Sequence, residues 1–320
     1  MRGLDLCRGF FFDVARPLLL RDFGGVGYAA GLIGYGSDVL GYDDAVSGDH
    51  MWGPRFYLFV QDAQKGREIL EMFSACLPYE YLGYSVNFSA PDLGDNGVRR
   101  PERICAGRVS PLIFVHTIEE YLEQYLGRAD FGDLTEADWL GFCEHKLLSL
   151  VRGEIFVDEI GLGAALRPIR WYPHGVVLRR IAGLWGEIAD EQAFVRRAAD
   201  AGDDLGSAII CGRIAEKLMR LGFLYCGQYA PYAKWFGRAF AELPLADTIK
   251  RALYAAVFAA CPDERENNLV EAQKLMAFVH NESSFTNIVN IDVQNYYGRK
   301  IKVIYAEKIA EAVLSKLRSC

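Results

Sequence analysis

The sequence lacks the patterns that mark several common protein classes. Its eight cysteines form no Cys-x-x-Cys pair, which argues against a zinc site of that type and against a small disulfide scaffold. No apolar run approaches the roughly 18 residues of a membrane-spanning helix, and Asp5 stands where a signal peptide needs a basic region. Basic residues are not in excess either, because 35 Lys+Arg face 42 Asp+Glu for a net charge of −7.

These absences define what kind of protein to expect. We predict a soluble, cytoplasmic protein with no membrane partner, in which most cysteines are small core side chains. The acidic balance argues against a dedicated duplex-binding module, and we do not expect a nucleic-acid partner, although the composition leaves room for one basic cleft that holds an anionic ligand. Nor is the chain disordered, because 51% of its 320 residues are hydrophobic and can bury a sizeable core.

The first part of the chain mixes strand-like and helical segments. Residues 4–23 have helical spacing, with Pro17 as a kink or restart. The apolar or aromatic runs predict strands and the three- and four-residue spacings predict helices. The predicted strands cover residues 25–34, 54–60, 84–88 and 112–116, and the predicted helices cover residues 63–77, 119–126 and 139–150.

The second part has the residue spacing that is typical of a helical bundle. Apolar side chains recur at three- and four-residue spacing, first at Leu178, Ile181 and Trp185. Pro262 followed by two acids is typical of a helix start. We therefore predict an α+β protein: an N-terminal α/β domain with a small mixed sheet over residues 1–170, then four or five helices over residues 171–320, the last at 306–317.

The segment from residue 34 to residue 55 carries the most chemistry. A strand that ends in Gly36-Ser37 and turns into a helix would present backbone N–H groups and a hydroxyl to a phosphate. Asp43 and Asp44 follow, and Asp49 comes at the head of the next predicted strand. Since alternate side chains of a strand point the same way, an acid there can aim at a metal ion that binds nucleotide phosphates. The simpler interpretation of Gly36-Ser37 is an ordinary turn with serine as a cap.

This segment resembles the Gly-Ser and Asp-x-Asp signature of the polymerase-β-type nucleotidyltransferase superfamily. It is more closely similar to a group of bacterial nucleotidyltransferase-like proteins with a C-terminal helical domain, and the resemblance covers most of the chain. The strings that carry it are Gly36-Ser37, Asp49-His50, Trp52-Gly53-Pro54-Arg55, Arg152-Gly153-Glu154, Trp171-Tyr172-Pro173, Gly202-Asp203-Asp204, Tyr229-Ala230-Pro231-Tyr232 and Lys234-Trp235-Phe236.

The resemblance implies an activity and a set of site residues. An active member transfers a nucleoside monophosphate, AMP in the first instance, from ATP or another nucleoside triphosphate to a hydroxyl or phosphate of a small molecule or a protein. It implies that Mg²⁺ (or Mn²⁺) lies between Asp49, the catalytic residue, and the phosphates. Gly36 and Ser37 would then hold the terminal phosphates.

One residue departs from the family pattern. Met51 stands where the superfamily has its second metal-binding aspartate, and a thioether is a poor ligand for a hard cation. Asp43 or Asp44 could supply the missing carboxylate, although both are equally consistent with a solvated turn; Glu154 is a further candidate. Two other functions therefore remain open: a nucleotide-binding protein with impaired catalysis, and a partner-modifying member of a toxin–antitoxin-like pair.

Several basic residues are candidate phosphate ligands. Arg55 has two interpretations of equal weight, a contact to substrate phosphate or an ion pair with a nearby acid. Arg213, Lys217 and Arg220 share a helix face, which is a solvated charged stripe or a cationic wall facing a triphosphate. Lys234 lies among aromatic residues and could contact phosphate as a point charge.

Overall fold

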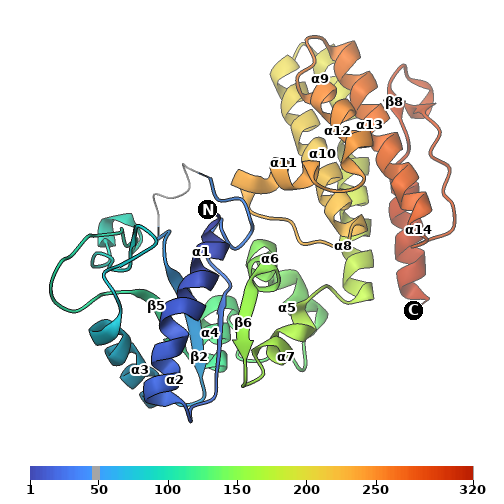
Figure 1. Ribbon diagram of the computed structural model, residues 1–320. Helices are drawn as coiled ribbons and strands as arrows, with labels where there is room; N and C mark the ends of the chain where they lie inside the picture. Colours follow the sequence, from blue (N-terminus) through green and yellow to red (C-terminus); the bar gives the residue numbers. More distant parts are fainter. Residues whose placement is uncertain (45–50, 320) are drawn as a thin grey trace. The chain divides into compact units, whose positions relative to one another are not determined.

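The computed structural model describes residues 1–44 and 51–319 (Figure 1). The chain divides into two compact units, residues 1–170 and residues 171–320. The first unit combines a sheet with short helices, and the second is almost entirely helical. The predicted α+β class, a small mixed sheet followed by a helical bundle, is confirmed.

A four-stranded mixed sheet forms the centre of the first unit. Its strands are β1 (Tyr28–Leu32), β2 (Arg55–Val60), β5 (Leu112–His116) and β6 (Glu154–Asp158), in the order β5-β2-β1-β6. Strand β1 pairs antiparallel with β2 and with β6, whereas β2 pairs parallel with β5. Every residue of β1 and β2 is buried, as expected for strands covered on both faces.

Alternate residues of β2 pack against different layers. Phe56, Leu58 and Val60 join the core cluster formed with the N-terminal helices and α3 (Ala63–Cys76). On the opposite face the rings of Tyr57 and Phe59 lie 5.1 and 5.3 Å from the Tyr121 ring of α4 (Ile118–Leu126). The period of two along the strand therefore distributes the aromatic side chains between two layers.

The N-terminal helix is continuous but irregular. It runs through α1 (Gly3–Phe10), a π-helical turn (Phe11–Ala15) and α2 (Arg16–Phe23). Pro17 lies just after the π-helical turn, so the backbone hydrogen bond that proline cannot make is lost where the regular α-helical pattern is already interrupted. The predicted helix with a restart at Pro17 is confirmed, because α2 begins at Arg16.

Short elements complete the first unit. The helices are α3 (Ala63–Cys76), α4 (Ile118–Leu126), α5 (Glu136–Gly141), α6 (Glu144–Arg152) and α7 (Leu162–Leu166). The remaining elements are β3 (Glu80–Tyr81), β4 (Tyr84–Ser85) and the 3₁₀ turns Leu93–Asp95 and Arg167–Ile169. The single helix predicted over residues 139–150 is wrong, because α5 ends at Gly141 and α6 begins after the extended Cys143.

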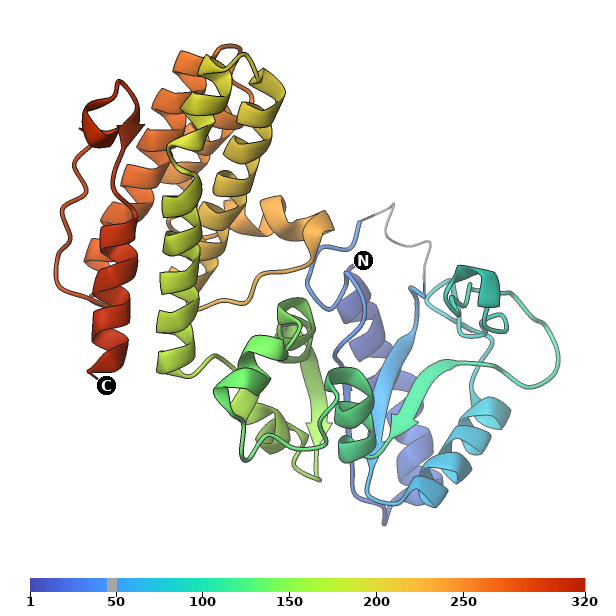
Figure 2. The same cartoon turned by 180° about the vertical axis from the view of Figure 1, so that it is seen from behind.

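The second unit contains seven α-helices within residues 171–319. They are α8 (His174–Glu191), α9 (Phe194–Asp200), α10 (Asp204–Tyr225), α11 (Ala233–Ala241), α12 (Ala246–Val257), α13 (Pro262–Glu282) and α14 (Glu307–Arg318). Helix α14 lies along α8 in both views (Figures 1 and 2). Pro262 is at the start of α13, as predicted. The sequence did not predict the hairpin of β7 (Gln294–Asn295) and β8 (Lys302–Val303).

Two expectations about side chains and membranes can be compared with the structure. The expectation that most cysteines are core residues is wrong, because only Cys7 and Cys211 are buried among the seven described cysteines. The described part of the chain has no helix of the length and apolarity needed to cross a membrane.

Candidate functional site

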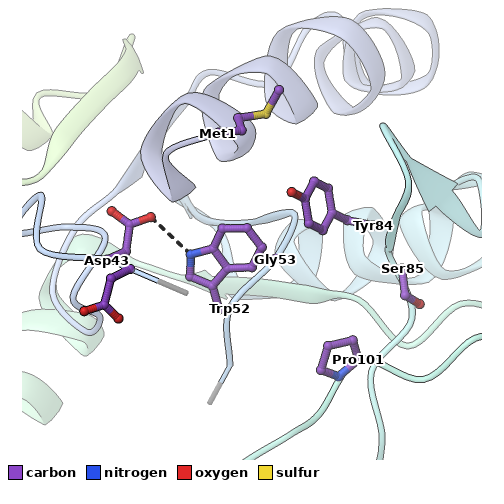
Figure 3. Close-up of a pocket in the computed structure, with 8 residues that line it drawn as sticks. Met1, Asp43, Trp52, Gly53, Tyr84, Ser85 and Pro101 are labelled. Carbon is purple, nitrogen blue, oxygen red and sulfur yellow. Dashed lines mark hydrogen bonds between the residues drawn. The ribbon is translucent and has the colours of Figure 1, made fainter. Parts of the chain in front are cut away.

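A cavity of about 530 Å³ opens beside the N-terminus of α1 (Figure 3). Its lining residues come from four segments: the N-terminal residue, the segment after β1, the segment before β2, and β4 with the loop that follows it. The lining residues are Met1, Asp43, Asp44, Trp52, Gly53, Tyr84, Ser85 and Pro101. Its volume lies within the range of about 300–1,000 Å³ that is usual for small-molecule sites.

Asp43 fixes one wall of this cavity. Its Oδ2 accepts a hydrogen bond from the backbone N–H of Gly3 at 2.6 Å and another from the Trp52 indole at 3.3 Å (Figure 3). The Gly3 N–H belongs to the first turn of α1, where N–H groups lack partners within the helix and a negative charge is favoured. Asp43 therefore orients Trp52 and joins the start of α1 to the segment that precedes β2.

Trp52 and Tyr84 form the aromatic wall of the cavity. Their ring centroids are 5.2 Å apart and the rings meet edge to face at 71°. Both residues are half-buried, so each ring still presents part of its surface. Trp52 belongs to the Trp52-Gly53-Pro54-Arg55 string that carries the resemblance, whereas nothing in the sequence pointed to Tyr84.

Arg55 lies inside the protein at the first position of β2. Only 1% of its surface is exposed, and its Nη2 donates to Asp38 Oδ1 at 2.6 Å and to the Tyr35 carbonyl at 2.9 Å. Burial is the largest effect on the pKa of the guanidinium and lowers it, but Asp38 and the other polar neighbours together outweigh burial and hold the pKa above its ordinary value. Of the two interpretations of Arg55, the structure shows the ion pair.

Asp38 is the buried acid that sequence reasoning missed. It is 2% exposed and also accepts the N–H of Val39 through Oδ1. The feature of the sequence that could have identified Asp38 is that it is an acid within an otherwise apolar and glycine-rich stretch, 17 residues before Arg55. No local spacing rule joins two residues that far apart, because their pairing depends on how the turn after β1 returns to β2.

The turn at Gly36-Ser37 differs from the expected strand-to-helix junction. Residues 37–41 form a turn and no helix, with the N–H of Tyr42 bonded to the carbonyl of Ser37 at 2.8 Å. The left-handed φ of 125° at Gly36 directs the chain away from a helical path. The prediction of a helix after Ser37 is therefore wrong, and neither Gly36 nor Ser37 lines the cavity. Their role as phosphate ligands stays a prediction.

The predicted metal-binding acids fall in two groups. Asp49 and its neighbour His50 lie outside the described residues. Asp43 and Asp44 both line the cavity. Within residues 1–44 and 51–319, no three His, Cys, Asp or Glu side chains are placed to hold a metal ion together.

Met51 does not belong to the neighbouring strand. Its φ of 48° is left-handed, and β2 begins four residues later at Arg55. The expectation that alternation along a strand governs this position is therefore wrong for Met51. A further candidate acid, Glu154 at the start of β6, is paired with Arg8 of α1, whose Nε donates to it at 2.6 Å.

The candidate phosphate ligands of the second unit have acidic or aromatic neighbours. Arg213 and Lys217 of α10 both bond Glu191 of α8, at 2.8 and 3.2 Å. Lys234 lies with its ammonium 4.8 Å from the centre of the Trp235 ring. These contacts agree with a charged helix face, and a phosphate role for the three residues stays a prediction.

Two of the strings that carry the resemblance meet in the second unit. The Tyr229 ring lies 4.8 Å from both the Trp171 ring and the Tyr172 ring. In addition, the Trp235 indole donates to the Tyr232 hydroxyl at 2.7 Å. The aromatic residues of these strings thus pack against one another, which gives them a structural role.

The chain is similar to known proteins in two respects. Residues 139–236 match the family described as a domain of unknown function (DUF4037), a region that extends from α5 into α11. Among solved structures, the chain is similar to a nucleotidyltransferase-like protein from Exiguobacterium sibiricum 255-15, with 11% sequence identity and a TM-score of 0.37, over 85% of this chain and 77% of that one. No curated protein matches the sequence. These findings are similarities, and none of them assigns an activity to the chain.

Proposed function

We propose that the first unit is a nucleotidyltransferase that binds a nucleoside triphosphate, ATP in the first instance, in the cavity beside α1. The observation that carries this proposal is that one cavity is lined by both an acidic pair, Asp43 and Asp44, and an aromatic pair, Trp52 and Tyr84. A nucleotide has matching parts: a flat base that stacks on rings, and phosphates that bind through a divalent cation. The resemblance of the segment around Trp52 supports the same function.

The donor set of the cavity suits a hard cation. The side chains of Asp43 and Asp44 offer carboxylate oxygens, the ligands that Mg²⁺ and Mn²⁺ prefer. Asp43 is already held in place by Gly3 and Trp52, which reduces the cost of ordering it. We assign Asp43, Asp44 and Asp49 to this ion, which supplies neutralising charge to the phosphates when bound.

The remaining lining residues have roles that follow from their positions. Trp52 and Tyr84 would contact the base, with the Trp52 ring fixed by its bond to Asp43. The hydroxyl of Ser85 is bonded to the carbonyls of Asn87 and Glu102, so it stabilises the loop that forms the far wall. Catalysis would depend chiefly on placing the acceptor hydroxyl or phosphate in line with the α-phosphate.

ATP binding to the purified chain tests the proposal. Mg²⁺–ATP should quench the tryptophan fluorescence, and Trp52→Phe should remove most of the quenching. Asp44→Asn should weaken Mg²⁺-dependent binding by about tenfold or more, because it removes a candidate ligand. Asp133→Asn, an exposed acid outside the cavity lining, is the matched control and should bind as the wild type does. Equal binding by the Asp44 and Asp133 variants would contradict the placement of the nucleotide.

Labelling with α-³²P-ATP tests the transfer step. Label on a protein band would identify a partner or the chain itself as acceptor, whereas label on a small product would identify a metabolite. Asp49→Asn should abolish either product, and release of pyrophosphate should accompany each transfer.

The second candidate function is nucleotide binding with impaired catalysis. Met51, which departs from the family pattern, is the observation that favours it. In that case the wild-type chain binds ATP without releasing pyrophosphate, and Met51→Asp raises turnover. This second candidate would be excluded if the wild-type chain turns ATP over and the Met51→Asp variant turns it over no faster.

A further inference from the structure

The hairpin in residues 294–305, which we call the tyrosine hairpin, exposes an aromatic cluster on the second unit. It lies at the start of α14, at the other end of that helix from the C-terminus (Figures 1 and 2). Three tyrosines gather at its tip: the Tyr296 and Tyr297 rings are 4.7 Å apart, and Tyr305 is 5.9 Å from Tyr297. Tyr297 is 69% exposed, so its ring is available to contact a ligand.

Cationic side chains surround this cluster. The Arg299 guanidinium lies 5.9 Å from the Tyr296 ring, and the Lys308 ammonium lies 4.8 Å from the Tyr305 ring. Lys300 and Lys302 are exposed between them, with Lys302 bonded to the side chain of Asn267. Four of the ten residues from Arg299 to Lys308 are therefore basic, and Glu307 is the acid among them.

Two acids near the hairpin already accept hydrogen bonds. Glu307 accepts a hydrogen bond from the Gln192 side chain at 3.0 Å, and Glu266 of α13 accepts the backbone N–H of Lys302 at 2.9 Å. Residues 171–320 as a whole are close to neutral, with 19 Lys+Arg and 17 Asp+Glu, so the excess of basic residues is local to the segment from Arg299 to Lys308.

The backbone holds the tyrosines in a costly conformation. Tyr297 and Tyr305 have left-handed φ values of 48° and 55°, which are rare for bulky residues. The Tyr305 hydroxyl accepts the N–H of Tyr297 and donates to the carbonyl of Asn295. The Tyr305 side chain therefore holds the backbone of the hairpin tip in place. Strain of this kind persists where the surrounding structure imposes it, and it is concentrated at functional sites.

We propose that the tyrosine hairpin binds a single-stranded polynucleotide. Unpaired bases stack on exposed rings with little regard to sequence, while neighbouring cations contact the phosphates. A duplex hides the faces of its bases, so an exposed ring among cations favours single strands. This inference goes beyond the proposed function and does not depend on it, because it concerns a different unit and a different ligand.

Fluorescence anisotropy of the full chain with a labelled oligonucleotide of about 20 nucleotides tests the inference. RNA and DNA versions of one mixed sequence show whether the 2′-hydroxyl matters. Tyr297→Ala should weaken binding by about tenfold, since base stacking on one ring has about that effect. Replacing both Arg299 and Lys300 by Gln should reduce the slope of log affinity against log salt by about 1.4, because each lost phosphate contact removes about 0.7.

Matched controls lie on α12. Tyr254 is 66% exposed, so Tyr254→Ala removes a ring of similar exposure, and Lys250→Gln with Arg251→Gln removes two exposed neighbouring cations. These controls should leave binding within about twofold of the wild type. Circular dichroism of each variant confirms that the fold is retained. The inference is overturned if the wild type binds no single strand at physiological salt, if a duplex binds more tightly, or if hairpin and α12 variants lose affinity equally.

Discussion

The ion pair of Arg55 and Asp38 connects the turn after β1 to the start of β2. Both side chains are almost fully buried, so each charge has exchanged water for its partner. The Cys7 thiol of α1 is close to them, donates to the Gly53 carbonyl at 3.3 Å, and has its pKa raised to about 12, chiefly by burial. This cysteine therefore stays a neutral thiol and adds no charge to the pair.

Gly36 lies directly over this pair, which leads to a prediction about its replacement. A methyl group at Gly36 would lie 2.1 Å from Asp38 Oδ1 and 2.2 Å from Arg55 Nη2, closer than atoms can approach. Gly36→Ala should therefore separate the buried charges and lower the free energy of unfolding by about 3–5 kcal/mol, the usual cost of breaking such a pair. Urea unfolding followed by circular dichroism measures this change.

Gly41→Ala is the control for the backbone contribution. Gly41 also has a left-handed φ, of 76°, but an added methyl group there has open space around it. Its replacement should cost only about 1 kcal/mol, the cost of placing alanine in that conformation. Equal losses in the two variants would show that Gly36 is required for its φ alone and would contradict the ion-pair explanation.

Single residues could be predicted where their role is local. Asp203 is of a residue type that commonly caps helices, and it caps α10 by accepting the N–H of Gly206 at 2.8 Å. Arg55 was predicted to contact substrate phosphate or to pair with a nearby acid, with equal weight, and the acid could not be named. Pairing across 17 residues depends on tertiary packing, which leaves no periodic trace in the sequence.

At the scale of elements, a chain of hydrogen bonds joins three helices of the second unit. The Trp185 indole of α8 donates to the Tyr225 hydroxyl of α10 at 2.8 Å, and this hydroxyl lies 3.0 Å from His280 Nδ1 of α13. His280 Nε2 lies 2.9 Å from the Thr286 hydroxyl, which donates to the Asn287 carbonyl. Since Thr286 uses its proton there, His280 must donate through Nε2 and accept from Tyr225 through Nδ1.

This arrangement predicts a loss of stability in acid. Burial lowers the pKa of His280 from 6.5 to about 4. Between these two pH values the unfolded chain binds a proton at His280 and the folded chain does not. The contribution of neutral His280 to the free energy of unfolding is therefore complete above about pH 6.5 and is lost as the pH falls towards 4. We expect His280 to account for about 3 kcal/mol of the decrease in the free energy of unfolding over this range.

Urea unfolding at several pH values, with His280→Gln beside the wild type, isolates this contribution. The stability advantage of the wild type over the variant should shrink by about 3 kcal/mol between pH 7 and pH 4. His174→Gln, which replaces an exposed histidine at the start of α8, should show no such change relative to the wild type. A constant difference between wild type and His280→Gln across this range would refute the explanation.

The elements themselves differ in how well the sequence predicts them. Strands β2 and β5 were predicted within one residue, because each is an uninterrupted apolar or aromatic run. Strand β6 was missed because its apolar run is only three residues long, between Glu154 and Asp158. The tyrosine hairpin was missed because its strands have two residues each and its turn depends on tyrosines with left-handed φ.

At the scale of the whole molecule, charge is distributed unevenly between the two units. Residues 1–170 contain 16 Lys+Arg and 25 Asp+Glu, a net charge of −9, whereas residues 171–320 have a net charge of +2. Both proposed ligands are anions. The negative charge of the first unit repels a triphosphate unless a cation neutralises the phosphates. A polynucleotide on the tyrosine hairpin contacts arginine and lysine side chains directly.

The two sites should therefore respond to chelation in opposite ways. EDTA should weaken ATP binding by at least about tenfold, because the carboxylates of Asp43 and Asp44 then face the phosphates without a cation between them. It should leave oligonucleotide binding unchanged or slightly tighter, because Mg²⁺ competes for the polynucleotide phosphates. Titrating both ligands into one preparation, with and without EDTA at constant ionic strength, measures the two responses together. ATP binding that persists in EDTA would contradict the metal assignment, and oligonucleotide binding that disappears in EDTA would contradict a direct contact between the hairpin and phosphate.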